Sequence, residues 1–167
     1  MLQLLRESGP GLLVPSAWLF VMGAQVDIVS SRSIFIAHLV MAAFITFFLA
    51  TGWNDMSTGA LAGWRAVMVV GLGITLAGIA GFLVSTASEA LLTTSLVGWM
   101  LLPAAGLAYT GRQLTDASTI YMGSAALSGL GAVIYTLSLA GVGSGLVGLG
   151  LVGVGQTVGI VDAVVRR

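Results

Sequence analysis

Cysteine and lysine are both absent from this chain, and each absence excludes a group of functions. Without cysteine there are no disulfides, no thiolate catalysis, no iron–sulfur cluster and no cysteine-ligated zinc. Without lysine there is no lysine Schiff base, so covalent attachment of retinal is excluded. All six basic residues are therefore arginines.

Charge of either sign is also scarce. Charged residues make up 7% of the sequence, whereas soluble globular domains carry about 25%. The net charge is zero and no basic run is present, so nucleic acid is not expected as a partner. Hydrophobic residues reach 57%, and this balance places the chain among membrane proteins, with membrane lipids as its first partners.

The clearest membrane segment is 33–52, which contains no acid, no arginine and no proline. At a rise of about 1.5 Å per residue, its length matches the roughly 30 Å hydrocarbon core of a bilayer. Inside lipid every backbone N–H and C=O must be paired within the segment, as a helix does. The segment therefore predicts a transmembrane helix in an integral membrane protein.

Further apolar segments predict an all-α fold, a polytopic transmembrane helix bundle with short loops that forms a single domain over residues 1–167. Six spans are expected, at about 11–29, 33–52, 66–84, 91–110, 120–140 and 145–164. Five spans remain the alternative, in which the first segment does not cross. No clear small-residue cleavage site precedes residue 33, so we expect the first segment to be a retained helix rather than a signal peptide.

The arginines predict the orientation of these spans. With six spans, all but one arginine fall on the same side, namely Arg6, Arg65, Arg112, Arg166 and Arg167. Arg32 alone falls on the other side, whereas five spans would divide the arginines four to two. The positive-inside rule then places both termini in the cytoplasm of a multi-pass protein of the cell membrane. The exclusive use of arginine, with abundant alanine and glycine, indicates a prokaryotic genome.

Small residues predict where the helices meet. Gly73, Ala77 and Gly81 recur every fourth residue, a stripe that allows close approach of a neighbouring helix. The segment 145–164 is glycine-rich and has no aromatic residue, so we expect it inside the bundle, with Gly155 and Gly159 on its packing face. The phenylalanines of 33–52 are expected to face lipid.

A proline lies inside the span expected at 91–110. Pro103 has no N–H and therefore frees the carbonyl of Trp99, so we expect a kink at this point. The same region raises the question of internal repeats, because 95–106 and 145–156 share Leu-Val-Gly and similar glycine spacing. Tandem helical hairpins would fit, but chance matches are common in a sequence with so few residue types.

Gln25, Asp27 and His38 form the first candidate site. If the first two spans form a hairpin, Gln25 and His38 lie at similar depth, about 10 Å from the turn. A His–Asp pair inside a membrane could relay protons or sense external pH. The alternative is that His38 bonds Gln25 or a backbone carbonyl and fixes the hairpin, while Asp27 reaches the headgroups.

Gln156 is the second candidate, midway along the glycine-rich segment. One interpretation is that Gln156 lines a path for a small solute or ion. The alternative is that it forms an ordinary hydrogen bond between helices. Asp162, near the end of this segment, is expected to pair with Arg166 four residues on. With a single histidine, no metal site and no cofactor are expected, although His38 leaves haem ligation open.

No catalytic motif is recognisable, because the chain lacks a Gly-x-Ser-x-Gly elbow and paired carboxylates within a span. We therefore expect no enzyme. The leading expectation is a non-catalytic structural or accessory membrane subunit, as a homo-oligomer or in a larger membrane complex. The alternative is a transporter or channel-like carrier of a small solute, proton or ion, and a third possibility is a haem-binding redox subunit. The carrier's polar path would consist of Gln25, Asp27, His38 and Gln156.

Overall fold

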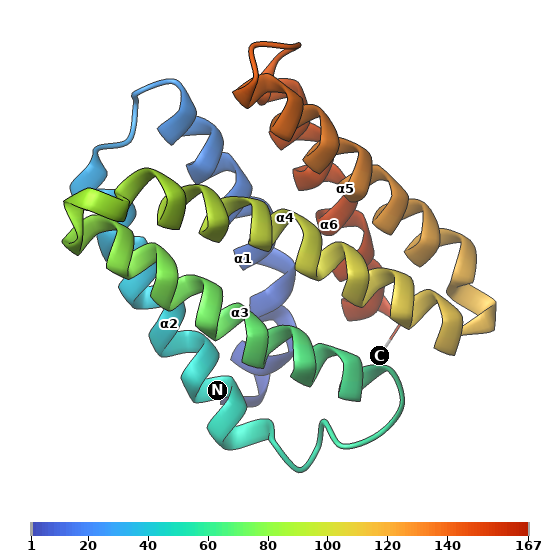
Figure 1. The fold of residues 1–167 in the computed structure, drawn as a ribbon. Coiled ribbons are helices and arrows are strands. Elements are labelled where there is room, and N and C mark those ends of the chain that lie inside the picture. The colour runs from blue at the N-terminus through green and yellow to red at the C-terminus, as the bar shows by residue number, and fades with distance from the viewer. Residues whose placement is uncertain (1, 167) are drawn as a thin grey trace.

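The apolar segments fold into long helices joined by short connections (Figure 1). The computed structural model describes residues 2–166, with side chains described from Gly11 onward, and this part contains helices and no strand. The helices are α1 (Leu2–Gln25), α2 (Ser31–Gly52), α3 (Gly59–Leu83), α4 (Ser88–Gln113), α5 (Ser118–Leu139) and α6 (Gly145–Val165). Single 3-10 turns at Ser85–Ala87 and Thr115–Ala117 lead into α4 and α5. The predicted all-α bundle is confirmed.

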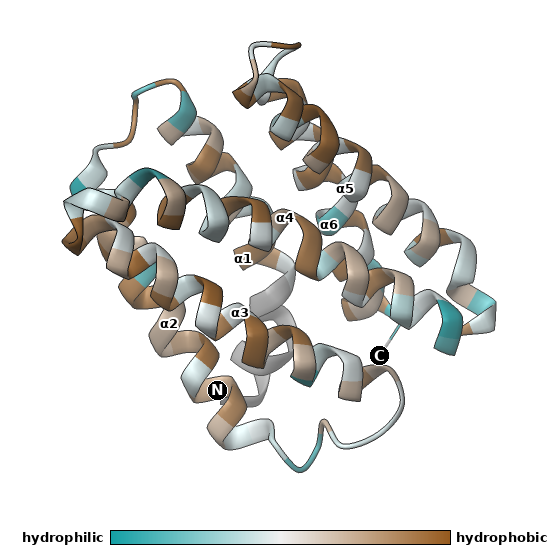
Figure 2. Cartoon of the chain, in the orientation of Figure 1, coloured by the Kyte–Doolittle hydropathy of each residue, from teal (hydrophilic) through white to brown (hydrophobic). Residues whose placement is uncertain are grey.

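The helices from α2 to α6 are each long and apolar enough to cross a membrane. The shortest, α6, has 21 residues, which at about 1.5 Å per residue spans the roughly 30 Å hydrocarbon core. In α1 the described apolar part, Gly11–Gln25, is shorter. Apolar residues recur along the helices, as Figure 2 shows. The chain is therefore a multi-pass membrane protein.

The helices pack mostly in sequence order, with one exception. The packed pairs are α2 with α3, α3 with α4, α4 with α5, and α5 with α6, while α4 also touches α6. Over the described residues α1 and α2 do not form a packed pair, although they are consecutive, and α1 packs along α6 instead. The bundle is thus an open ring with a gap between α1 and α2.

The hairpin expected from the first two segments does not form, because α1 packs along α6 instead, where a glycine leaves room for a large side chain of α1. A Cβ placed on Gly153 would lie 3.1 Å from the Cβ of Trp18, so the glycine makes room for the tryptophan. A Cβ on Gly11 would lie 3.5 Å from the Val164 side chain, so this point of α1 lies beside the last turns of α6. The start of α1 and the end of α6 therefore lie at the same end of the bundle. The first helix also ends at Gln25 rather than near residue 29.

The closest helix contact joins α5 and α6. A Cβ on Gly148 would lie 2.7 Å from the Gly131 carbonyl oxygen, and one on Gly131 would lie 2.6 Å from the Gly148 carbonyl oxygen. Farther along, a Cβ on Gly155 would meet the Ser128 Oγ at 2.6 Å. Backbone thus lies against backbone, which places α6 inside the bundle as expected. By contrast, α2 is mostly exposed, including Phe44.

The packing face of α3 differs from the expected stripe of Gly73, Ala77 and Gly81. Gly73 is exposed, and a Cβ placed there would meet nothing within 4 Å. A Cβ on Gly81 would lie 2.9 Å from Leu92, so this end of the stripe does contact α4. The rest of the α3 face that packs in the bundle consists of Val67, Gly71, Thr75 and Gly78.

Two reciprocal hydrogen bonds fix α3 against α4. Trp64 Nε1 donates to Thr110 Oγ1 at 3.0 Å, and Trp99 Nε1 donates to Thr75 Oγ1 at 3.1 Å. Each threonine hydroxyl donates in turn to the carbonyl of the glycine four residues before it. A shared pattern of Gly-Trp, then Gly, then Thr at equal spacing occupies 63–75 and 98–110. The two helices therefore repeat one another locally, antiparallel and related by an approximate two-fold.

Candidate functional site

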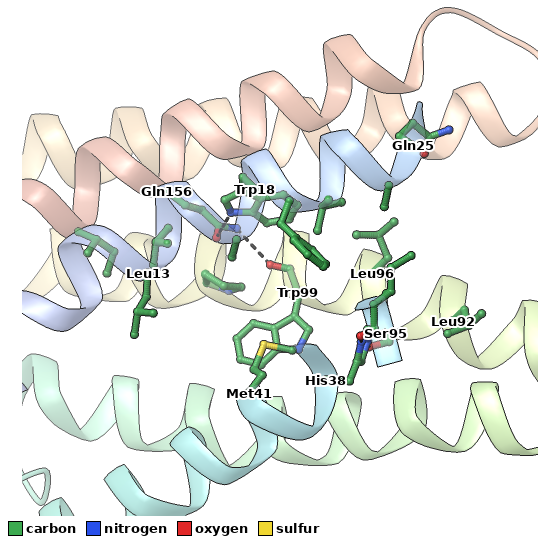
Figure 3. Close-up of a pocket in the computed structure, with 18 of the residues that line it drawn as sticks. Leu13, Trp18, Gln25, His38, Met41, Leu92, Ser95, Leu96, Trp99 and Gln156 are labelled. Atoms are coloured by element: carbon green, nitrogen blue, oxygen red, sulfur yellow. Dashed lines mark hydrogen bonds between the residues drawn. The ribbon is translucent and has the colours of Figure 1, made fainter. Parts of the chain in front are cut away.

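The gap between α1 and α2 opens into a cavity of about 760 Å³, which we call the α1–α2 cleft. Its walls come from α1, α2, α3, α4 and α6, and most of the lining side chains are apolar. The cleft falls within the roughly 300–1,000 Å³ of typical small-molecule sites. All four polar residues singled out from the sequence line it, namely Gln25, Asp27, His38 and Gln156. Figure 3 shows three of them along its length.

Gln156 joins three helices at the wall of the cleft (Figure 3). It is 4% exposed, and its Oε1 accepts a hydrogen bond from Trp18 Nε1 on α1 at 3.0 Å. Its Nε2 donates to the α4 carbonyls of Trp99 at 3.1 Å and Met100 at 3.2 Å. The amide thus forms hydrogen bonds through both its oxygen and its nitrogen, as expected of a polar side chain that links neighbouring membrane helices.

The Trp99 carbonyl is the one that Pro103 frees. In an unbroken helix it would accept from the N–H of residue 103, which proline lacks. Gln156 supplies the missing donor from α6, and α4 continues as one helix through Pro103. Sequence reasoning marked both residues without connecting them. A buried polar group in lipid needs a partner. The carbonyl freed by Pro103 in one span and the single amide midway along another could therefore have been paired from the sequence.

His38 faces α3 and α4 rather than Gln25. Its Nδ1 lies 2.9 Å from the Ile34 carbonyl oxygen. Since a carbonyl only accepts, Nδ1 donates this hydrogen bond. Nε2 lies 3.5 Å from Ser95 Oγ on α4. The ring stands edge-on to Phe82 at 5.6 Å and fits over Gly78, where a Cβ would come within 2.5 Å of it. The carbonyl belongs to the same helix as His38, so this contact does not fix α1 to α2 as the alternative from the sequence required.

The Nδ1 contact of His38 is common to packing histidines and to metal or haem ligands, since a ligating histidine also donates its other ring N–H to a backbone carbonyl. Its Nε2 lies 3.5 Å from Ser95 Oγ, at the outer limit of a hydrogen bond. Over the part of the chain that the structure describes, no group of three or more His, Asp or Glu side chains is placed to hold a metal ion.

Gln25 and Asp27 lie at the end of the cleft where α1 leads into α2. Asp27 has a left-handed backbone, with φ of 59°. The Ile28 N–H donates to the Gly23 carbonyl and the Asp27 N–H to the Ala24 carbonyl, which is the Schellman arrangement that ends many helices. Aspartate is among the few non-glycine residues that tolerate this conformation. Gln25 and Asp27 line this end of the cleft and are both exposed, and among the described residues no side-chain hydrogen bond or ion pair engages either of them.

Charged groups gather at the opposite end of the bundle. Arg166 Nε donates to Asp162 Oδ2 at 2.6 Å, which confirms the expected pair. This hydrogen bond and the carboxylate's charge raise the pKa of the Arg166 guanidinium. The Arg65 guanidinium lies 4.8 Å from the centre of the Trp53 ring, in a cation–π contact. Tryptophan and arginine together are typical of a membrane–water interface.

Comparisons of the chain with protein-family models, with curated proteins and with solved structures find no match. Function is therefore inferred from the geometry and chemistry of the cleft alone.

Proposed function

We propose that this chain is a non-catalytic accessory protein of the cell membrane, which holds a small molecule from the lipid phase in the α1–α2 cleft. The observation that supports this is the cleft itself, an apolar cavity of about 760 Å³ between two helices that do not pack together. Because α2 is long and apolar enough to span the membrane, we expect the opening beside it to face the acyl chains and to admit a ligand from the bilayer. The protein would then present the ligand to a larger membrane complex or to a second copy of this chain.

The volume of the cleft fits a small molecule. The α1 residues that line the cleft run from Leu13 to Gln25, a length of about 18 Å at a rise of about 1.5 Å per residue. The cavity of about 760 Å³ lies within the roughly 300–1,000 Å³ of small-molecule sites, and we propose such a molecule as its occupant.

Filling the cleft should remove the bound molecule. Ala17 lines the cleft from α1 and is not itself packed in the core, so Ala17→Phe should occupy the space without disturbing the fold. We expect a molecule that co-purifies with the wild type at near one per chain to fall at least tenfold in this variant. Native mass spectrometry and lipid extraction after mild solubilisation would measure it.

Ala126→Phe is the matched control, because Ala126 is an exposed alanine on α5 that does not line the cleft. This variant should keep the bound molecule at the wild-type level. Equal occupancy in the wild type and in a well-folded Ala17→Phe protein would refute the proposal.

A carrier is the second candidate, and the convergence of the four polar residues on one cleft favours it. It predicts flux of a small solute, proton or ion through proteoliposomes. The flux should disappear in Ala17→Phe and in a double variant of His38→Ala and Asp27→Asn, and persist in Ala126→Phe. Flux that needs these residues, without a tightly bound molecule, would favour the carrier over the holding protein.

We also propose six crossings, with both termini in the cytoplasm. The positive-inside rule supports this, because Arg65, Arg112 and Arg166 belong to the end of the bundle where α1 begins and α6 ends. A reporter enzyme that is active only in the cytoplasm, fused after Arg167, should be active. Activity only for a periplasmic or extracellular reporter at that position would reverse the orientation.

A further inference from the structure

We infer that the ligand of the α1–α2 cleft is a single-chain amphiphile with a small, uncharged head that donates hydrogen bonds, such as a long-chain acyl or prenyl alcohol. The inference rests on the proposed function and assigns the chemical class of the molecule held. Its head lies beside Gln25 and Asp27, and its tail extends toward Leu13.

The length of the cleft indicates a chain. At about 18 Å along α1, it slightly exceeds half of the roughly 30 Å hydrocarbon core, which is the depth of one leaflet. On α4 the lining runs from Leu92 to Leu107, about 22 Å. A lipid tail that enters sideways from one leaflet would therefore run along the cleft without leaving its own depth.

Polar capacity is concentrated at one end of the cleft. Midway along it, the Gln156 amide and the Trp18 indole N–H bind each other, and Gln156 binds α4. Trp64 lines the far part of the cleft, and its indole N–H is engaged by Thr110. Gln25 and Asp27, at the other end, have no described side-chain partner. His38 and Ser95 also line the cleft and contact each other at 3.5 Å, with Ser95 near the start of α4. The polar groups therefore lie toward the side where α1 leads into α2, and this sets the direction of the tail.

The charge at that end selects the head. Three charged residues lie on this side of the bundle, Asp27, Arg32 and Glu89, and all three are exposed. The net charge of these three residues is −1, and a negative charge at this end of the bundle disfavours an anionic head. A hydroxyl donates its one hydrogen to the Asp27 carboxylate and accepts with its oxygen from the Gln25 amide N–H. A fatty acid of the same length should bind less well than the alcohol.

Photo-crosslinking in proteoliposomes tests both the direction and the head. One probe is hexadecanol with a diazirine at the tail end, and a second carries the diazirine next to the hydroxyl. The tail-labelled probe should mark peptides around Leu107 and Ile160, which line the far end of the cleft. The head-labelled probe should mark the connection at residues 25–31. The reverse pattern would overturn the inference.

Competition by unlabelled molecules tests the head separately. Hexadecanol and farnesol should each displace the probes, and palmitate should need a concentration about fivefold higher, the effect of one exposed charge interaction of about 1 kcal/mol. In Asp27→Asn, which keeps a residue that tolerates the left-handed backbone, this disadvantage should vanish. Equal competition by palmitate in the wild type would overturn the choice of an uncharged head. Stronger competition by a two-chain diacylglycerol would overturn the single chain.

The Ala17→Phe and Ala126→Phe variants separate this inference from the proposed function. If Ala17→Phe loses crosslinking but the marked peptides or competitors differ from those expected, the cleft holds a ligand of another class and only this inference fails. If Ala17→Phe and Ala126→Phe both crosslink as the wild type does, the cleft is not the binding site and the proposed function fails with it.

Discussion

Gly148→Ala should destabilise the bundle by about 1–3 kcal/mol, the usual cost of overfilling a packed interior. The added methyl group would lie 2.7 Å from the Gly131 carbonyl oxygen and 2.7 Å from the Tyr135 backbone nitrogen. Backbone atoms cannot turn aside as a flexible side chain does, so α5 and α6 must separate. Because their contact runs along both helices, the separation would also loosen the packing at Gly155 and Ser128.

Gly150→Ala is the control for this prediction. It lies two residues along the same helix, and a Cβ there would meet nothing within 4 Å. Alanine has the higher helix propensity, by about 1 kcal/mol in an exposed soluble helix, so this variant should be neutral or slightly stabilised. Reversible unfolding of both variants in mixed bicelles with increasing SDS would measure the difference. Equal stability of the two variants would mean that α5 and α6 do not meet backbone to backbone.

Gln156→Leu should cost about 2 kcal/mol, because it removes three hydrogen bonds of about 0.6 kcal/mol each. It would leave Trp18 Nε1 and the Trp99 carbonyl without these partners. Gln113→Leu, at an exposed position at the end of α4, should cost little in the same unfolding assay. A cost for Gln156→Leu no larger than that of Gln113→Leu would contradict the assignment of Gln156 as the junction of three helices.

A double-mutant cycle with Pro103→Ala tests why the glutamine is there. Alanine at 103 restores an N–H that can bond the Trp99 carbonyl within α4. Gln156→Leu should then cost less in the Pro103→Ala background than in the wild type, with a coupling of about 0.5–1 kcal/mol. Additive effects would show that the proline and the glutamine act independently.

The number and type of the helices could be predicted from the sequence, because hydropathy over about twenty residues decides them and no long-range contact is needed. The helix ends were less predictable. Residues 59–65 were expected in a polar connection, yet α3 begins at Gly59. Inside the bundle, hydropathy does not choose between alternative faces of one helix.

The packing face of α3 shows why. This helix carries a stripe through Gly73, Ala77 and Gly81 and a second one through Gly71, Thr75 and Gly78, and both present small residues. The ring of Trp99 decides between them, since it fits against Gly71 and donates to Thr75. That choice depends on a side chain in another helix, so no periodicity within α3 reveals it.

The candidate site was predictable in its members and not in its arrangement. Polar or ionisable residues are rare in apolar spans, so Gln25, His38 and Gln156 stand out in the sequence by residue type alone. Their grouping required knowing that α1 leaves its neighbour α2 and packs on α6. The Gly153 surface that receives Trp18 comes from a segment more than a hundred residues away along the chain.

The matched pattern in α3 and α4 makes the two helices interchangeable at this contact. A single helix bearing Gly-Trp, Gly and Thr at this spacing would complement an antiparallel copy of itself, because each tryptophan would donate to the threonine of the other helix. The hairpin thus has the geometry of a homodimer of helices held within one chain. Its two tryptophan–threonine bonds are also redundant, so the loss of one would leave the alignment of the pair to the other.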